Sequence, residues 1–239
     1  MKKVCIILPT YNEVENVKEL IPRIFSIFKI NKLDGKIIVV DDNSSDGTKD
    51  VIENFQKKYS IVLINRPKKM GIGSAYTDGF NRTLNDDSEI IFEMDADLSH
   101  NPIFIPNFVK EIDKGFDVVI GSRRIEGGSV IGWNWYRKFV SFGGNSIGKY
   151  IAGIDIDDLT SGFRAYKKKV IESLDLNKIE SEGYAFQLEI LAKCLKKGFK
   201  ISSIPIEFYD RYSGKSKLSK LDFLNFFLIA LKIRFGMIK

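Results

Sequence analysis

Two acidic residues, Asp95 and Asp97, are separated by one alanine and directly follow an apolar run in the stretch IIFEMDADLSHNP, residues 90–102. Carboxylates at positions i and i+2 of a turn can converge on a hard divalent cation, and Mg²⁺ typically takes one or two protein carboxylates together with substrate phosphates. Such a cation offsets the charge of a diphosphate leaving group. Capping is the other common use of Asp, but both members of the pair cannot be caps. Paired hydrolytic acids need several Å between them, so this spacing favours a metal.

Basic residues form a second group, because many of them fall in predicted loops or at the starts of elements. Guanidinium groups clamp phosphate bidentately, whereas lysine acts as a point charge. Each of these basic residues taken alone could simply be a solvated surface charge. For the whole set, phosphate binding is the favoured interpretation. The loop DRYSGKSKL, residues 210–218, contains Gly214 and serines that would let it close over a diphosphate. The set comprises Arg123, Arg137, Lys138, Arg164, Arg211, Lys215 and Lys217.

Three further signals are weaker. The stretch GIGSAY, residues 71–76, resembles a dinucleotide fingerprint but has Tyr76 at its third position, and no glycine-rich turn follows the first strand, so we reject it. The only histidine, His100, adjoins the acidic turn, where a structural role is favoured over catalysis. Asn43 and Asp46 are left open between a turn or cap and a site.

Short apolar strands alternate with amphipathic helices through the first half of the chain. We predict strands at 4–8, 36–40, 61–65, 89–94 and 117–122, with helices between them. This alternation indicates an α/β fold with a parallel sheet covered on both faces. Ligands of such sheets bind outside the carboxyl ends of the strands. The stretch PTYNE, the pair Asp41 and Asp42, residues 66–73 and the acidic turn would therefore face one crevice.

The second half is less regular. We expect an irregular stretch rich in glycine and aromatic residues at 127–145, a helix around 186–195, a strand at 200–208 and a C-terminal helix at about 219–237. No repeat or linker divides the chain, so we expect a single domain over residues 1–239.

The composition of the chain limits the kinds of partner it could bind and the cellular compartment in which it could work. The 239 residues carry 37 basic and 31 acidic side chains, and the net charge of +6 suits an acidic partner. Nucleic acid is not expected, because no helix-turn-helix, zinc or aromatic-sheet signature is present. Cys5 and Cys194 are expected to be buried in the core as free thiols, which indicates a reducing compartment. We expect no signal peptide and no transmembrane domain, because the apolar runs are too short.

The motifs PTYNE, DDNSSDGT and DADLSH resemble the signatures of the inverting glycosyltransferases of family 2. The later motifs GSRR, GGSVIGWNWYRK, DLTSGFRAYKK and DRYSGKSKL are similar, in the same order, to those of the dolichyl-phosphate mannosyltransferases within that family. The resemblance spans nearly the whole chain. It implies the A-type glycosyltransferase fold, a Rossmann-like, mostly parallel central sheet flanked by helices. It also implies metal-dependent transfer of mannose from GDP-mannose to dolichyl or another polyprenyl phosphate, giving a β-linked product.

The resemblance further implies roles for matching positions. The nucleoside of the donor would be held by Pro9, Tyr11, Glu13, Val40, Asp42, Asp95 and Ala96. Mg²⁺ or Mn²⁺ would be held by Asp95 and Asp97, with Ser99 standing where some members have a longer Gln. The diphosphate would be neutralised by Arg211 and Lys217, and the acceptor phosphate bound by Arg123, Arg137 and Ser141. Catalysis would thus rest on Asp97 and the four basic residues, with a phosphate oxygen as nucleophile and no need for a strong base.

The same resemblance predicts a membrane-bound acceptor. The C-terminal helix is apolar from Phe223 to Leu231 and has basic flanks, which fits either an interfacial helix or a helix packed in the core. Trp133, Trp135 and Phe139 offer a second membrane contact, with Phe142 beside them, although core packing explains them too. We expect a cytoplasmic protein, peripheral on the cytoplasmic face of a membrane, and a membrane-anchoring partner subunit is left open.

Two other functions fit the same motifs. A polyprenyl-phosphate glucosyltransferase using UDP-glucose would share them, because base and sugar choice depend on contacts that motifs do not reveal. A noncatalytic nucleotide-binding or membrane-scaffold protein of the same fold would bind GDP without turnover.

Overall fold

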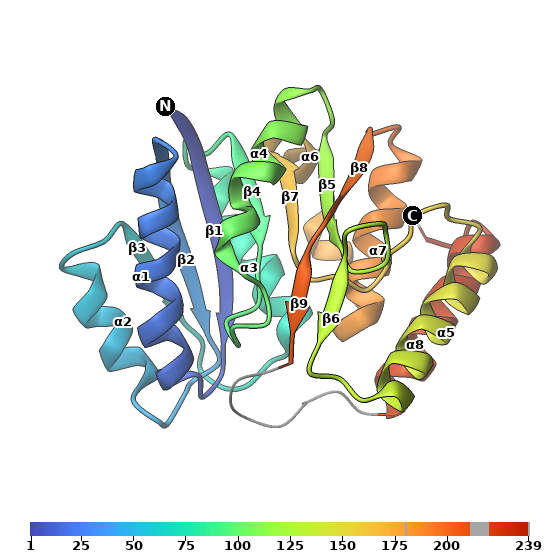
Figure 1. Ribbon diagram of the computed structural model, residues 1–239, viewed down its shortest axis with the longest axis horizontal. Helices are drawn as coiled ribbons and strands as arrows, with labels where there is room; N and C mark the ends of the chain where they lie inside the picture. Colours follow the sequence, from blue (N-terminus) through green and yellow to red (C-terminus); the bar gives the residue numbers. More distant parts are fainter. Residues whose placement is uncertain (180, 211–219, 239) are drawn as a thin grey trace.

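The computed structural model describes residues 1–179, 181–210 and 220–238, so the predicted site residues Arg211 and Lys217 lie outside the described residues. A seven-stranded sheet with the order β3-β2-β1-β4-β7-β5-β8 forms the centre of the described part (Figure 1). β7 pairs antiparallel with β4 and β5, and the other pairs are parallel. The prediction of a mostly parallel sheet is therefore confirmed. The strands are β1 (Lys2–Thr10), β2 (Leu33–Asp41), β3 (Ile61–Asn65), β4 (Ile90–Glu93), β5 (Val118–Ser122), β7 (Arg164–Lys167) and β8 (Ile201–Pro205).

Alternating side chains of β1 explain why helices cover both faces of the sheet. Ile6 packs into one apolar cluster and Ile7 into the other, as successive strand residues point to opposite faces. The first cluster is covered by α1 (Val14–Ile30), α2 (Thr48–Gln56), the short η1 (Pro102–Phe104) and α4 (Ile105–Asp113). The second is covered by α3 (Ile72–Leu84), α6 (Lys168–Ser173), η2 (Leu176–Lys178) and α7 (Gly183–Lys196). This three-layer arrangement leaves the strand ends free for a site.

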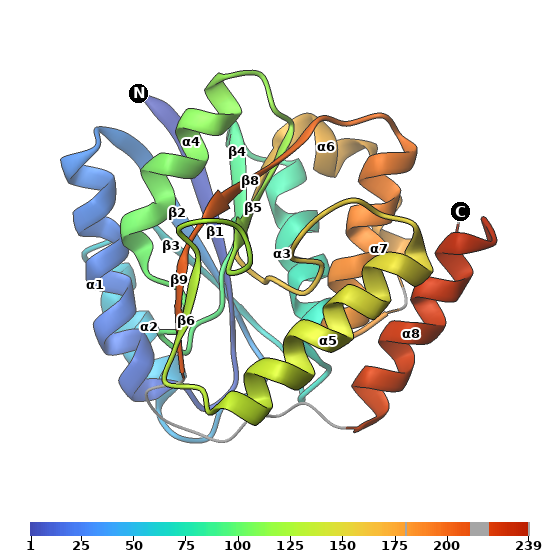
Figure 2. The ribbon, with the colours of Figure 1, turned by 45° about the vertical axis from the view of Figure 1, so that its right-hand side comes forward.

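Two helices pack side by side at one edge of the molecule, beyond α7 (Figure 2). They are α5 (Trp135–Ala152) and α8 (Lys220–Arg234), and α8 also packs against α7. Phe226 and Ala230 of α8 are buried, whereas Leu224 and Leu228 are exposed. One side of the C-terminal helix thus packs in the core and the other is apolar surface, and its interfacial role stays a prediction.

The prediction of an irregular stretch at 127–145 is wrong. It contains β6 (Ser129–Ile131), which pairs with β9 (Glu207–Tyr209), and most of α5. The buried positions of α5 include Asn145 and Gly148, while Trp135 and Phe139 are 79% and 72% exposed. Because the apolar side chains face outward, the usual helical pattern of apolar residues is missing. The predicted strand at 200–208 is also interrupted, and its residues divide between β8 and β9.

Gly148 sets the distance between α5 and α8. A Cβ at this position would lie 2.4 Å from Cε1 of Phe226, so even an alanine would force the helices apart. We expect Gly148→Ala to lower the free energy of unfolding by about 1–3 kcal/mol through overpacking. Gly143→Ala is the matched control, because a Cβ there meets nothing within 4 Å and should add up to about 1 kcal/mol of helix propensity. Denaturant unfolding that gave both variants the same sign would contradict this account.

Candidate active site

A cavity of about 330 Å³ opens at the carboxyl ends of β1, β2 and β4. The predicted donor positions on its wall are Pro9, Tyr11, Glu13, Asp42, Asp95 and Ala96. The wall also includes Asp97, His100, Arg123 and Arg137. Within the described residues Val40 and Ser99 are not on it, because Val40 packs in the core beneath the strand end and Ser99 is fully buried. The structure therefore brings most of the predicted positions together, and their roles remain predictions.

The acidic turn is held by neighbours on both sides. Asp95 Oδ1 accepts a hydrogen bond from the Tyr76 hydroxyl at 3.0 Å, and Asp97 Oδ1 accepts one from the Ser99 backbone N–H at 3.1 Å. The described residues contain no cluster of three or more His, Cys, Asp or Glu side chains. Two carboxylates on the wall of an open cavity nevertheless fit Mg²⁺ or Mn²⁺, because such ions complete their shell with substrate phosphates and water.

His100 supports this turn. Its Nδ1 accepts a hydrogen bond from the backbone N–H of Asp95 at 3.2 Å, and its ring stacks on Phe163 with centroids 5.2 Å apart. Burial lowers the pKa of His100, so the ring is neutral near pH 7 and its proton sits on Nε2. These contacts agree with the structural role predicted for this histidine.

Asp42 lies at the end of β2 and is fixed by the loop after β3. Its Oδ1 lies 2.6 Å from Nε of the buried Arg66, and its Oδ2 accepts from the backbone N–H groups of Met70 and Gly71 at 3.2 Å. Arg66 Nη2 also donates to the Gly71 carbonyl. Arg66 therefore fixes the part of the cavity wall that Asp42 forms. The neighbouring Asp46 accepts from backbone N–H groups at the starts of α1 and α2, which is the turn role left open for it.

Two of the predicted acceptor residues, Arg123 and Arg137, line the first cavity, whereas Ser141 is not on its wall among the described residues. Arg137 stands over the Trp133 ring at 4.0 Å and donates to Asp210 at 2.8 Å. Ser141 accepts from Arg124 Nη2 at 3.1 Å. A second cavity of about 380 Å³ lies between α5 and α8. Arg137 lines both cavities, and Ser141 lines the second.

One member of the basic set was wrongly interpreted. Arg164 is fully buried and donates hydrogen bonds to the backbone carbonyls of Leu159, Ser161 and Gln187 in the core. It cannot reach a phosphate in the cavity, because its donors are directed at these carbonyls.

Comparison with known proteins now identifies the family. Residues 5–175 match the family described as Glycosyl transferase family 2. The chain belongs to this family. The glycosyltransferase is 35% identical over 220 residues to polyprenol monophosphomannose synthase of Mycolicibacterium smegmatis, covering 91% of this chain and 82% of that one. It is 35% identical over 218 residues to undecaprenyl-phosphate mannosyltransferase of Micrococcus luteus, covering 91% and 88%.

Solved structures agree with the fold. Glucosyl-3-phosphoglycerate synthase from Mycobacterium tuberculosis, solved with phosphoglyceric acid, superposes with a TM-score of 0.68 at 18% identity, covering 98% of this chain and 80% of that one. The same enzyme with Mn²⁺, uridine diphosphate and phosphoglyceric acid gives a TM-score of 0.70 at 17% identity. The glycosyltransferase therefore has the A-type fold that its sequence motifs predicted.

Glu182, for which the sequence carries no signal, also lines the cavity. Its carboxylate accepts hydrogen bonds from the backbone N–H groups of Gly73 at 2.7 Å and Ser74 at 3.0 Å, at the N-terminus of α3. A carboxylate in this place is favoured by the helix dipole, yet partial burial raises its pKa. Because Glu182 and Gly73 are 109 residues apart, no local pattern could have paired them.

Glu93 is expected to make the stability of the glycosyltransferase depend on pH. It is fully buried at the end of β4, it accepts from Tyr166 and Gln187, and burial raises its pKa to about 7. The folded protein thus retains a proton that the unfolded chain releases above pH 4.5. Its contribution is complete below pH 4.5 and is lost as pH rises through 7, so the free energy of unfolding should fall on the order of 3 kcal/mol over this window.

Urea unfolding at pH 5, 6, 7 and 8 tests this prediction against Glu93→Gln. The amide cannot ionise, so the pH dependence should be flatter in the variant than in the wild type. Equal slopes for the two proteins would show that Glu93 does not titrate in this range.

Proposed function

We propose that this glycosyltransferase transfers mannose from GDP-mannose to the phosphate of dolichol or another polyprenol, with inversion at the anomeric carbon. The observation that carries the proposal is that the acidic turn and two arginines, Arg123 and Arg137, line the same cavity. A sugar diphosphate and a phosphate acceptor would each find their counter-charges there. The names of both curated relatives, which match nine-tenths of this chain, agree with mannosyl transfer to a polyprenyl phosphate.

The proposed chemistry depends on positioning. Asp95 and Asp97 would hold Mg²⁺ or Mn²⁺, which when bound would offset the charge of the departing diphosphate. Arg123 and Arg137, with Ser141, would bind the acceptor phosphate and direct its oxygen at the anomeric carbon. A phosphate monoester loses its second proton near pH 6, so the nucleophile is already ionised at neutral pH and the chain needs no strong base.

Donor contacts would come from the other wall. Tyr11, Glu13 and Asp42 would hold the nucleoside, and the side chain of Lys69, 4.6 Å above the Tyr11 ring, lies beside them. Arg211 and Lys217, outside the described residues, would neutralise the diphosphate.

The acceptor lipid would lie along α5 and α8. The second cavity shares Arg137 with the first and is lined by apolar side chains of both helices, which suits the first isoprene units of a polyprenol. None of the described helices is both long and apolar enough to cross a bilayer. We therefore propose peripheral attachment at the cytoplasmic face of a membrane through the exposed apolar side chains of α5 and α8. A membrane-anchoring partner subunit would bind the same exposed apolar side chains in place of lipid.

Trp135 and Phe139 test this attachment. Replacing both with Ser should lower binding to vesicles that contain anionic lipid by about tenfold or more, because each side chain buries a large apolar area at the interface. Co-sedimentation with vesicles measures the effect. Ile30→Ser is the matched control, because Ile30 is similarly exposed, at 74%, but lies at the end of α1. Unchanged binding of the double variant would move the membrane contact elsewhere.

The test of the proposed function is the transfer of labelled sugar into an organic-extractable polyprenyl phosphate. GDP-mannose and UDP-glucose are supplied side by side, with and without Mg²⁺. We expect metal-dependent product from GDP-mannose alone. Product from UDP-glucose would keep the mechanism and change the donor. GDP binding with no lipid product from either donor would favour a noncatalytic scaffold.

A further inference from the structure

Asp158, in the loop between α5 and β7, is a fully buried carboxylate that the proposed chemistry does not use. Both of its oxygens face Arg123: Oδ2 accepts from Nε at 2.7 Å and Oδ1 accepts from Nη2 at 2.6 Å. Oδ2 also accepts from the backbone N–H of Arg123 at 3.2 Å. Thr160 accepts from the same Nη2 at 2.9 Å. This bidentate geometry fixes the plane of the guanidinium group.

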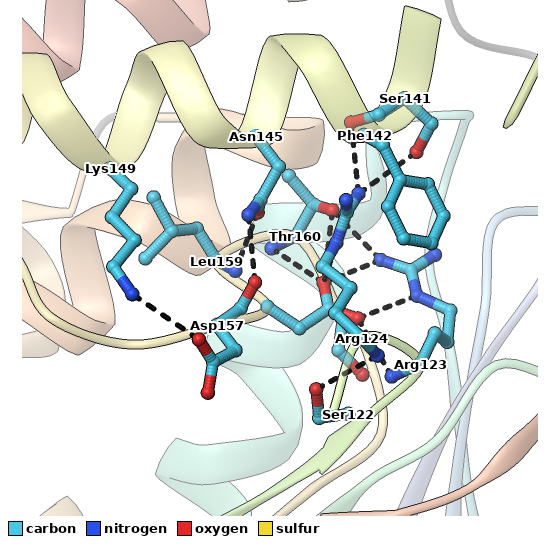
Figure 3. Close-up of polar contacts among 12 residues, drawn as sticks. Ser122, Arg123, Arg124, Ser141, Phe142, Asn145, Lys149, Asp157, Leu159 and Thr160 are labelled. Atoms are coloured by element: carbon cyan, nitrogen blue, oxygen red, sulfur yellow. Dashed lines mark hydrogen bonds and ion pairs between the residues drawn. The ribbon is translucent and has the colours of Figure 1, made fainter. Parts of the chain in front are cut away.

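A second arginine shares the same carboxylate. Arg124 Nε lies 3.6 Å from Asp158 Oδ1. The Arg124 guanidinium lies 4.2 Å from the centre of the Phe142 ring, and both residues are labelled in Figure 3. Two adjacent buried guanidinium groups would repel each other without an anion between them. The arginines hold the pKa of Asp158 at about 2, so this anion is present at every pH near neutrality.

The loop that carries Asp158 is tied to α5. Asn145 Nδ2 donates to the carbonyl of Asp157 at 2.7 Å, and its Oδ1 accepts from the backbone N–H of Leu159 at 2.9 Å (Figure 3). Arg124 Nη2 reaches the same helix through the carbonyl of Ser141 at 2.9 Å. The orientation of Arg123 is therefore set by the helix that borders the second cavity.

We propose that Asp158 is a positioning residue that turns Arg123 toward the phosphate of the acceptor. Among the contacts of the described residues, Asp158 and Thr160 occupy Nε and Nη2, so the Nη1 edge of Arg123 is left for a ligand in the cavity that this arginine lines. The inference rests on the proposed function, because that function assigns the acceptor phosphate to Arg123. It differs from charge masking, in which Asp158 would compete with the phosphate and its removal would tighten binding.

The test measures binding of farnesyl phosphate and, separately, of GDP by titration calorimetry. Asp158→Asn keeps the size of the side chain but removes its charge and one acceptor. We expect it to weaken farnesyl phosphate binding by about tenfold while GDP binding stays within about twofold. Arg123→Ala should weaken it similarly, and the double variant should lose no more than Arg123→Ala alone. Asp157→Asn is the matched control, because its side chain contacts only Lys149 among the described residues, and it should bind as the wild type does.

Three results would overturn the inference: tighter farnesyl phosphate binding by Asp158→Asn, an equal loss of GDP binding, or additive losses in the double variant. Thr160→Val provides a milder test that applies even where Asp158→Asn fails to fold. It removes one acceptor of Arg123 and should weaken farnesyl phosphate binding by about threefold, and no change would count against the inference. Because these are binding measurements, they stand apart from the transfer assay, whose failure on the wild-type protein would count against the proposed function.

Discussion

Asp97→Asn is expected to lower the rate of sugar transfer by about a thousandfold or more and to leave the fold intact. Asn has the size of Asp and still accepts the hydrogen bond from the Ser99 backbone N–H. It lacks the charge with which a carboxylate binds a hard divalent cation. The loss would therefore fall on stabilisation of the leaving diphosphate, which is a transition-state contribution and lowers kcat.

Initial rates at saturating donor and acceptor over a range of Mg²⁺ and Mn²⁺ concentrations measure this effect. Asp46→Asn is the matched control, because Asp46 also follows a strand of the sheet but binds backbone N–H groups and does not line the cavity among the described residues. Its rate should stay within about threefold of the wild type. An Asp97→Asn variant that kept more than a tenth of the wild-type rate would remove the metal role from the acidic turn.

The features predicted from sequence are those with a local cause. The strand at 61–65 and the helix predicted to follow it agree with the structure, because apolar runs and helical spacing are set by neighbouring residues. The acidic turn was recognised for the same reason, since both carboxylates follow one strand. The crevice followed from a general property of parallel sheets.

The features that the sequence did not reveal depend on contacts distant along the chain. Arg164 and Arg123 look alike in sequence, yet one is enclosed by backbone carbonyls and the other is paired with Asp158, 35 residues away. The insertion of antiparallel β7 between β4 and β5 likewise has no local signal. Helix α5 was not predicted because its apolar side chains face outward. A helix that contacts lipid with its outer face lacks the spacing of apolar residues that marks a helix packed on a core.

Arg137→Ala is expected to lower kcat/KM for the lipid acceptor by about 30- to 100-fold and to leave the KM for the sugar donor within about twofold. The reason is that Arg137, in the first turn of α5, lines both cavities and has its guanidinium held over Trp133 and paired with Asp210. A charge-assisted bond to phosphate is worth about 1.5–3 kcal/mol, and the residue that supplies it at this position would act on the acceptor alone.

The neighbouring Lys138 provides the control for Arg137. Lys138 belongs to the basic set predicted from the sequence and lies on the same turn of α5, but it is exposed and lines neither cavity among the described residues. Lys138→Ala should therefore change kcat/KM for the acceptor less than twofold. Arg137→Lys should fall between the two, because lysine keeps the charge and loses the fork that binds two phosphate oxygens at once. Steady-state kinetics with each substrate varied in turn separate the cases. Equal losses for donor and acceptor in Arg137→Ala, or equal losses in Arg137→Ala and Lys138→Ala, would mean that Arg137 contributes general positive charge rather than a contact with the acceptor phosphate.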